Sequence, residues 1–380
     1  MKYEELQKIN DNNDKEIKIF KKKKMKKKKK KALRIRFYFF IPFILLLFIA
    51  FEIYKKMISN KTYINATNES KTYATNTTNE SKTYATKEGE FNDEINQNYL
   101  NEQKNFCLNQ DKLNKSLIDN QIQIVKAHLN DIYFEMFVYK KNDIVSNEIR
   151  GRGSWEAKDT NIILSILEYY SKKRNVDKKD IYIIDIGANI GWYSFLLGKK
   201  GYNILSFEPS KTNYYILRKT YCLYNNMNIT FINKGLDKVE NITFLYHPID
   251  NIGNAMLASN FLKDFIKEEI ILTKLNNYLN FFKNKNLALI KIDIEGSEGK
   301  AVEGGIDFIS KYHVPFIIME FNPISFRKKG VDPKAVLEIF YNNGYKISIK
   351  DFLNKEYMSI DDLLKVGLVN LYIVYPKFFE

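Results

Sequence analysis

The sequence contains little cysteine and little histidine. Its 380 residues include two cysteines, Cys107 and Cys222, and three histidines. This count excludes a framework of several disulfides and the usual four-ligand cysteine zinc site. One disulfide between the two cysteines is compatible with the sequence, although sequence alone does not establish it. The chain therefore has to rely on a hydrophobic core, and its 45% apolar residues are enough for one.

Most of the chain has little excess of positive charge, although the net charge of the whole chain is +15. Residues 1–40 hold 16 of the 60 basic residues and 5 of the 45 acidic ones. Residues 41–380 therefore hold 44 basic and 40 acidic residues, a net charge of only +4. A domain that binds nucleic acid needs clustered positive charge. We therefore predict no nucleic-acid partner for the folded part.

The basic tail is followed by an apolar stretch. Lys21–Lys31 is almost pure lysine, and Phe37–Phe51 has no charged residue. A cleaved signal peptide is disfavoured because the basic region is long and bulky residues follow the apolar stretch. A nuclear or RNA-binding arm explains the lysines but not the apolar residues beside them. We predict a basic cytosolic tail at 1–36 and a transmembrane signal-anchor at 37–54, with the charge bias placing the N-terminus in the cytosol.

A polar, repetitive segment follows the predicted membrane span. The octapeptide NESKTYAT occurs at Asn68–Thr75 and again at Asn79–Thr86, and five N-x-S/T sequons lie between residues 60 and 81. Such a segment is typical of a stalk, and the sequons fit a lumenal location in the secretory pathway. We predict a low-complexity stalk at 55–92 and a helical connector at 93–130. The remaining residues, 131–380, form the predicted catalytic domain.

Strands and helices alternate through this last segment, which predicts an α/β domain with a mostly parallel sheet and a C-terminal antiparallel hairpin. Before the alternation begins, two stretches look strand-like, at 134–141 and 143–149. Further on, the pattern predicts helices at 160–172, 270–280 and 300–311.

The stretch IIDIGANIGWY marks the end of the first strand of this sheet. Asp185 ends the strand, and Gly187 and Gly191 form a turn before a helix. The dinucleotide fingerprint requires glycine where Asn189 and Trp192 stand, which disfavours a hydride-transfer enzyme. An acid beside a two-glycine turn suits a cationic nucleotide instead. Glu208 ends the second strand, where a carboxylate can accept both hydrogens of a ribose diol.

The third acidic element is IKIDIEGSEGK. Asp293 and Glu295 have the same strand parity, so both could face a cleft at the end of the strand. We predict that one of them is a general base, or that both hold a divalent ion; the sequence defines no other metal-ligand set. Glu298 and Glu303 are interpreted as surface charges of the following helix.

The segments DIGANIGWYS, FEPS, IKIDIEGSEGKAVEGG and MEFNP together resemble the S-adenosylmethionine-dependent methyltransferases of the FkbM type. The resemblance implies a Rossmann-like methyltransferase fold and S-adenosylmethionine as cofactor. It places Asp293 and Glu295 beside the transferred methyl group and the acceptor. The residues that it assigns to the cofactor are Asp185, Gly187, Asn189, Gly191, Glu208 and Asp237.

The predicted function is therefore O-methylation of a hydroxyl group on a glycan, glycolipid or small molecule, by in-line displacement with carboxylate or metal assistance. Two alternatives remain at this stage. One is a non-catalytic, membrane-tethered adaptor that keeps the nucleotide pocket. The other is a nicotinamide-dependent oxidoreductase, which the missing glycines disfavour.

Overall fold

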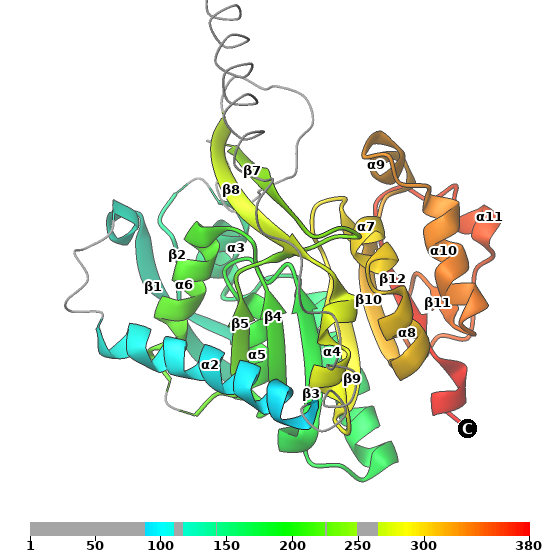
Figure 1. Cartoon of the computed structure of the whole chain (residues 1–380), viewed down its shortest axis with the longest axis horizontal. Helices are drawn as coiled ribbons and strands as arrows, with labels where there is room; N and C mark the ends of the chain where they lie inside the picture. The colour runs from blue at the N-terminus through cyan, green and yellow to red at the C-terminus, as the bar shows by residue number, and fades with distance from the viewer. Residues whose placement is uncertain (1–87, 110–116, 142, 225, 249–264) are drawn as a thin grey trace, which may run out of the picture. The chain divides into compact units, whose positions relative to one another are not determined.

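The computed structural model (Figure 1) describes residues 88–109, 117–141, 143–224, 226–248 and 265–380. All of them belong to one compact unit, Ser81–Glu380. The predicted tail, the predicted span at 37–54 and most of the predicted stalk lie outside the described residues. Among the helices of the described ranges, none has the length and hydropathy that a bilayer span requires.

A seven-stranded sheet forms the centre of the unit, in the order β11-β12-β10-β9-β3-β4-β5. Every neighbouring pair from β10 to β5 is parallel, and β12 is antiparallel to both β10 and β11. The predicted parallel sheet and its antiparallel C-terminal hairpin are thus confirmed. The strand bounds are β3 Ile181–Ile186, β4 Asn203–Phe207, β5 Ile229–Ile232, β9 Asn286–Ile292, β10 Phe316–Phe321, β11 Lys346–Ser348 and β12 Val369–Val374.

The chain changes direction across this sheet beside β3. From β3 it proceeds outward to β4 and β5, and it then returns to the other side of β3 to build β9 and β10. In open α/β sheets, ligands bind at such a switch point, beyond the carboxyl ends of the strands. The ends of β3, β4 and β9 are therefore the place to look for a site.

Helices cover both faces of the sheet, and alternating strand residues supply the two cores. Ile181 and Ile183 of β3 pack in one hydrophobic cluster, whereas Ile184 and Ile186 pack in the other. Burying each such side chain contributes about 1.5–3 kcal/mol. The helices around the sheet are α4 Ala157–Arg174, α5 Trp192–Lys199, α6 Lys211–Tyr221, α7 Glu298–Glu303, α8 Ile306–Tyr312, α9 Pro323–Lys328, α10 Pro333–Asn342 and α11 Ile360–Leu363.

Two smaller sheets flank the central one. The hairpin of β1 Ile122–Leu129 and β2 Ile132–Tyr139 precedes α3 Ile144–Arg152. The order β6-β8-β7 forms a three-stranded sheet, with β6 Gly235–Leu236, β7 Asn241–Pro248 and β8 Phe265–Thr273. Short 3-10 segments lie at Leu117–Asn120, Lys178–Asp180, Leu275–Tyr278, Asn280–Phe282 and Pro376–Phe378.

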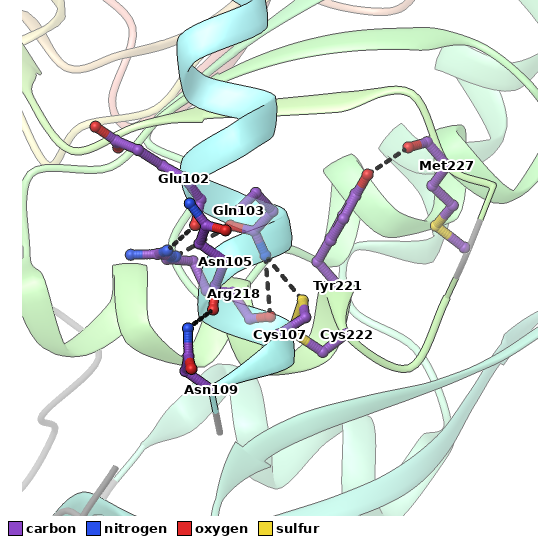
Figure 2. Close-up of a disulfide and its surroundings, with 9 residues drawn as sticks. All are labelled: Glu102, Gln103, Asn105, Cys107, Asn109, Arg218, Tyr221, Cys222 and Met227. Carbon is purple, nitrogen blue, oxygen red and sulfur yellow. Dashed lines mark hydrogen bonds between the residues drawn. A yellow bond between two sulfur atoms is a disulfide. The ribbon is translucent and has the colours of Figure 1, made fainter. Parts of the chain in front are cut away.

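Helix α2, Glu88–Leu108, is attached to α6 by a disulfide (Figure 2). Cys107 near the end of α2 is bonded to Cys222, the C-cap residue of α6, across 115 residues of sequence. Arg218 of α6 strengthens the same contact. Its Nε donates to Gln103 Oε1 (3.0 Å), its Nη2 donates to the carbonyl oxygen of Glu102 (2.8 Å), and its guanidinium lies 4.0 Å from the ring centroid of Phe106.

Four secondary-structure predictions need correction. Within the connector predicted to be helical at 93–130, α2 extends to Leu108 and a short 3-10 helix lies at Leu117–Asn120, but residues 122–129 form β1 because they pair with β2. Residues 143–149 begin α3, whose N-cap Asp143 accepts a hydrogen bond from the Ser146 backbone N–H. Residues 270–273 are strand because they pair with β7. The helix predicted at 300–311 is two helices, which meet at Gly304 and Gly305.

Candidate functional site

The turn after β3 brings three strand ends together. The backbone N–H groups of Gly187 and Ala188 both donate to the carbonyl oxygen of Phe207, at the end of β4 (3.0 Å each). Gly187 has a φ of 84°, and a Cβ atom there would lie 1.8 Å from the carbonyl oxygen of Asp293. Only glycine allows β3 and β9 to approach this closely. Gly191 ends the turn as the N-cap of α5, also with a positive φ.

Glu208 is held at the end of β4 by backbone donors. Its Oε2 accepts from the Asn189 N–H (2.8 Å), and its Oε1 accepts from the Ser210 N–H (2.9 Å). The side chain is buried, and burial raises its pKa to about 7 even though these hydrogen bonds oppose the shift. The carboxylate is thus fixed in orientation and still borders the cavity described below.

Asp185 lies beneath this turn and is 1% exposed. Its Oδ2 accepts from Ser194 Oγ (2.6 Å), and Ser194 Oγ lies 2.7 Å from Ser206 Oγ. Burial raises the pKa of Asp185, and the positive charge of Lys291 opposes that shift. Asp185 does not line the cavity. It supports the start of α5 and the neighbouring strand β9 from below.

A cavity opens above the ends of β3, β4 and β9. Its space, including the open solvent at its mouth, is about 1010 Å³. One part of its wall is apolar and includes Leu236, Leu245 and Leu272 from the β6-β8-β7 sheet. The sequence-predicted residues that line it are Gly187, Asn189, Glu208, Asp293 and Glu295.

The predicted residues that do not line the cavity are Asp185, Gly191 and Asp237. Gly191 stands between two residues that do, Ile190 and Trp192. Asp237 follows the lining residue Leu236, and its Oδ1 accepts from the Val239 N–H (3.3 Å). Its carboxylate thus bonds within its own turn.

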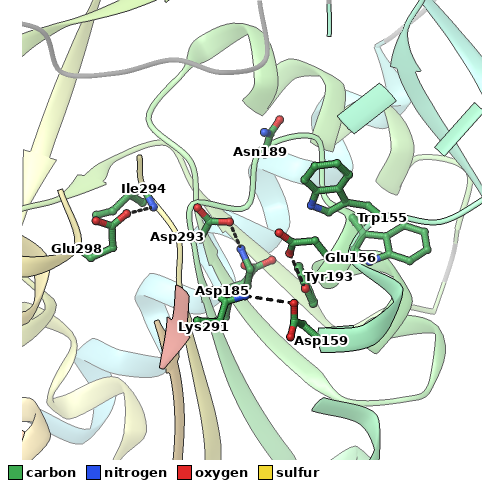
Figure 3. A network of polar contacts seen from close by, with 12 residues as sticks. Trp155, Glu156, Asp159, Asp185, Asn189, Tyr193, Lys291, Asp293, Ile294 and Glu298 are labelled. Carbon is green, nitrogen blue, oxygen red and sulfur yellow. Dashed lines mark hydrogen bonds and ion pairs between the residues drawn. The ribbon is translucent and has the colours of Figure 1, made fainter. Parts of the chain in front are cut away.

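Lys291 is a buried cation in the wall of the cavity (Figure 3). Its Nζ lies 3.1 Å from Asp293 Oδ2 and 4.7 Å from the centroid of the Tyr193 ring. Burial lowers the pKa of Lys291, but Asp293, Asp185 and Glu156 outweigh it and raise the pKa overall. Lys291 therefore stays charged and fixes the orientation of Asp293.

Glu156 continues this network on the side of α4. It accepts a hydrogen bond from the Tyr193 hydroxyl at its Oε2 (2.8 Å), and it has a φ of 42°, which is unfavourable for a residue other than glycine. Burial raises its pKa. Trp155, the preceding residue, lines the cavity. The sequence signal for this network is the lysine within the otherwise apolar strand LIKID, a signal that our predictions missed.

A second group of acids lies beyond Asp293. Glu295 has a φ of 56°, and burial together with the charges of Asp293 and Glu298 raises its pKa to about 7. Glu320 in β10 has a pKa raised to about 8, by burial and by the same neighbouring carboxylates. Glu298 is 1% exposed, so our interpretation of it as a surface charge is wrong. Its Oε1 accepts from the N–H groups of Ile294 and Gly296, which draws it under the turn.

Several solved structures resemble the chain at low sequence identity. The bifunctional kinase-methyltransferase WbdD is 12% identical, with a TM-score of 0.36 over 60% of this chain. Magnesium protoporphyrin IX methyltransferase from Synechocystis PCC 6803 is 14% identical, with a TM-score of 0.30 over 61% of this chain and 84% of its own. A precorrin-6y C5,15-methyltransferase from Geobacter metallireducens GS-15 is 10% identical, with a TM-score of 0.29 over 56% of this chain and 88% of its own.

This chain spans 41% of the length of WbdD. All three TM-scores are below 0.5. No curated protein matches the sequence.

The match to a protein family is more specific. Residues 185–347 match the methyltransferase FkbM domain, which confirms the resemblance found in the sequence. The matched range begins at Asp185 and contains the turn after β3, Glu208 and the acidic group around Asp293. The matched range, which supplies all but two of the residues that line the cavity, is therefore a methyltransferase domain of the FkbM type.

Proposed function

We propose that the protein is an S-adenosylmethionine-dependent methyltransferase that methylates a hydroxyl group. One observation carries the proposal: at the switch point of a methyltransferase domain, Glu208 borders the cavity with each carboxylate oxygen held by a backbone N–H. A carboxylate fixed in this way can accept the two hydrogens of a ribose diol.

The cavity suits the rest of such a cofactor. Its apolar wall at Leu236, Leu245 and Leu272 offers a surface for a flat base, and Pro209 and Phe207 lie beside it. The carboxylates of Glu208, Asp293 and Glu295 line the cavity together with Lys234 and Lys291, and the side that the carboxylates form favours a cationic sulfonium. We assign Gly187 and Asn189 to the turn that lies against the cofactor. Asp185 and Gly191 shape that turn, and Asp237 acts only through the loop that carries Leu236.

S-adenosylmethionine, when bound, supplies a methyl group that is already activated for displacement. The chain has to hold the acceptor oxygen in line and remove its proton. We propose that Asp293 or Glu295 receives that proton, since both border the cavity. Lys291 holds Asp293 in one orientation, which reduces the reorganisation needed during the reaction. Positioning contributes several kcal/mol to such reactions, up to roughly 10 kcal/mol in favourable cases.

The acceptor that we propose is a glycan, a glycolipid or a small molecule. Labelled-methyl transfer from S-adenosylmethionine to a cell extract, with the purified full chain as enzyme, tests the activity. Label in an alkali-stable ether is the expected result. Cofactor binding without any transfer would favour the non-catalytic adaptor, and binding of a nicotinamide nucleotide in its place would favour the oxidoreductase.

We also propose that the domain is lumenal, anchored by residues 37–54 with the N-terminus in the cytosol. The disulfide between Cys107 and Cys222 supports this location, because disulfides persist mainly in oxidising compartments. The sequons of the predicted stalk agree with it. The location requires that S-adenosylmethionine, which is made in the cytosol, be imported into that compartment.

Two measurements test the location. Glycosidase treatment of the cellular protein should increase its gel mobility, and a thiol-reactive reagent should label it only after reduction. Unchanged mobility together with two reactive thiols before reduction would place the domain in the cytosol. That result would leave the methyltransferase proposal untouched.

A further inference from the structure

Three carboxylates from three elements converge beside the cavity. Asp293 follows β9, Glu298 begins α7, and Glu320 lies in β10; one oxygen of each lies within 4.8 Å of the others. Topology explains the meeting of the two strand residues. In the parallel pair of β9 and β10, Ile292 is opposite Met319. The residues that follow them, Asp293 and Glu320, are therefore neighbours at the same edge of the sheet. Figure 3 shows Glu298 on the other side of Asp293 from the Lys291 network.

Two buried oxygen atoms in this region have no hydrogen-bond donor. Glu298 is 1% exposed, and its Oε1 accepts both of its hydrogen bonds, from Ile294 and Gly296. Its Oε2 is buried without a partner among the described residues, and so is the neighbouring Ser297 Oγ, whose residue lines the cavity. A buried carboxylate oxygen is normally satisfied by a donor or a cation.

Two lysines lie near this group, and each makes its hydrogen bond to a partner other than Glu298 and Glu320. The charge of Lys329 nevertheless faces Glu298 and Glu320. Lys291 directs its Nζ to Asp293 Oδ2 at 3.1 Å, and it also faces Asp185 and Glu156. Lys329 donates from its Nζ to the backbone carbonyl oxygen of Glu295. Within the described ranges, neither lysine makes a hydrogen bond or an ion pair with the side chain of Glu298 or Glu320. The carboxylate of Glu295 adds a further negative charge nearby.

We propose that Asp293, Glu298 and Glu320 bind one divalent cation of the hard type, such as Mg²⁺, Mn²⁺ or Ca²⁺. The donor set is oxygen only, which these ions prefer. Metal–oxygen distances of about 2.0–2.6 Å allow two ligands of one ion to be up to about 5 Å apart, which accommodates the observed spacing. The sequence predicted Asp293 and Glu295 as the possible pair of metal ligands. In the structure-based set, Glu298 and Glu320 replace Glu295.

The site borders the cavity through Asp293, which belongs to both. The role that we assign to the cation rests on the proposed methyl transfer: it coordinates the acceptor hydroxyl and lowers the pKa of that hydroxyl. The acceptor class that fits such a site best carries two neighbouring oxygens, as a sugar diol does. The cation site itself is a claim about the protein, independent of the acceptor.

The test is cation binding to the full chain, measured by Mn²⁺ titration with the electron paramagnetic resonance signal of free Mn²⁺ as readout. Mg²⁺ and Ca²⁺ are then used to compete with Mn²⁺. We expect one saturable site per chain and an affinity at least 10-fold weaker in Glu320→Gln and Glu298→Gln. Glu303→Gln is the matched control, since Glu303 lies on the same helix but pairs with Lys238 at 2.8 Å; its affinity should equal that of the wild type.

Glu298→Gln keeps an acceptor oxygen for the Ile294 and Gly296 N–H groups, and circular dichroism checks that each variant is folded. If Glu298→Gln does not fold, Glu320→Gln still decides the question. Absence of a saturable site, or equal affinity in Glu320→Gln and Glu303→Gln, would overturn the proposal. Binding of S-adenosylmethionine, measured separately by calorimetry, distinguishes the two ideas. Cofactor binding without cation binding removes only the cation site, and the reverse result removes only the proposed function.

Discussion

Glu208 and Glu298 are both buried glutamates that follow a parallel strand, and both accept two backbone N–H bonds. They differ in how those bonds are shared. Glu208 receives one at each oxygen, from Ser210 and Asn189. Glu298 receives both at Oε1, which leaves Oε2 buried without a donor. The first arrangement is a complete recognition group for a neutral diol, whereas the second still has an oxygen to offer to a cation.

The charges around the two glutamates differ in the same way. Glu208 faces His247 of the β6-β8-β7 sheet as its main charged neighbour. Glu298 faces the acids Asp293, Glu295 and Glu320, with Lys329 as the nearby cation. We therefore expect substitutions on the β4 side of the cavity to change cofactor affinity, and substitutions on the β9 side to change turnover.

The largest effect is expected from the β9 side. Asp293→Asn combined with Glu295→Gln should lower kcat by about 10²–10⁴-fold, because the proton acceptor is lost. The dissociation constant of S-adenosylmethionine should change much less, and steady-state kinetics with calorimetry measure both. An equal loss in affinity and turnover would mean that the two sides of the cavity do not divide these tasks.

The next effect is on stability and comes from the β4 side. The pKa of Glu208 rises from 4.5 to about 7 on folding, so the folded state binds the proton more tightly than the unfolded state. Its contribution to stability is present below pH 4.5 and is lost as the pH rises to 7. The change is about 3 kcal/mol. Urea unfolding of the wild type and of Glu208→Gln between pH 4 and 8 should show the stability of the wild type falling relative to that of the variant over this window.

His247 is the titratable neighbour of Glu208, and its Nε2 lies 2.8 Å from Glu268 Oε2. Repeating both unfolding series in a His247→Asn background separates the two titrations. If the wild type and Glu208→Gln keep a constant difference in that background, Glu208 is not the group that titrates.

The Glu208 environment could be predicted from the sequence to a large extent, because a glycine turn and a strand-end acid are local signals. The strand ends carrying Asp185 and Asp293 were predicted for the same reason. The burial of Glu298 could not be predicted, because it depends on a turn that folds back so that Ile294 and Gly296 donate to its side chain. The segment EGSEGK has the polar composition of an exposed helix, so its sequence does not indicate that Glu298 is buried.

Other errors also come from distant pairing. Residues 122–129 become a strand only because β2 pairs with them, and residues 270–273 become a strand because of β7. The disulfide, in contrast, was left open in the sequence and not wrongly predicted, because it joins cysteines 115 residues apart and no local pattern specifies that pairing. Tertiary contacts outweigh local propensity in residues 122–129 and 270–273.

A smaller effect is expected when Glu208 is replaced for its role in cofactor binding. Glu208→Gln should weaken S-adenosylmethionine about 10–100-fold, since a hydrogen bond to a charged group contributes about 1.5–3 kcal/mol. Turnover at saturating cofactor should remain within a few fold of the wild type. Calorimetry at pH 8, where the wild-type carboxylate is ionised, measures the affinity. Unchanged affinity would remove the assignment of Glu208 to the ribose.

The smallest effect is expected at Asp237, a predicted cofactor residue that does not line the cavity and whose carboxylate bonds within its own turn. Its Oδ1 accepts from the Val239 N–H, and its backbone N–H donates to the carbonyl oxygen of Thr273 (2.9 Å). Asp237→Asn keeps an oxygen for that turn, so we expect the cofactor affinity to change less than about 3-fold, within roughly 0.7 kcal/mol. A loss as large as that of Glu208→Gln would place a cofactor contact at Asp237 and extend the recognition side of the cavity beyond the β4 end.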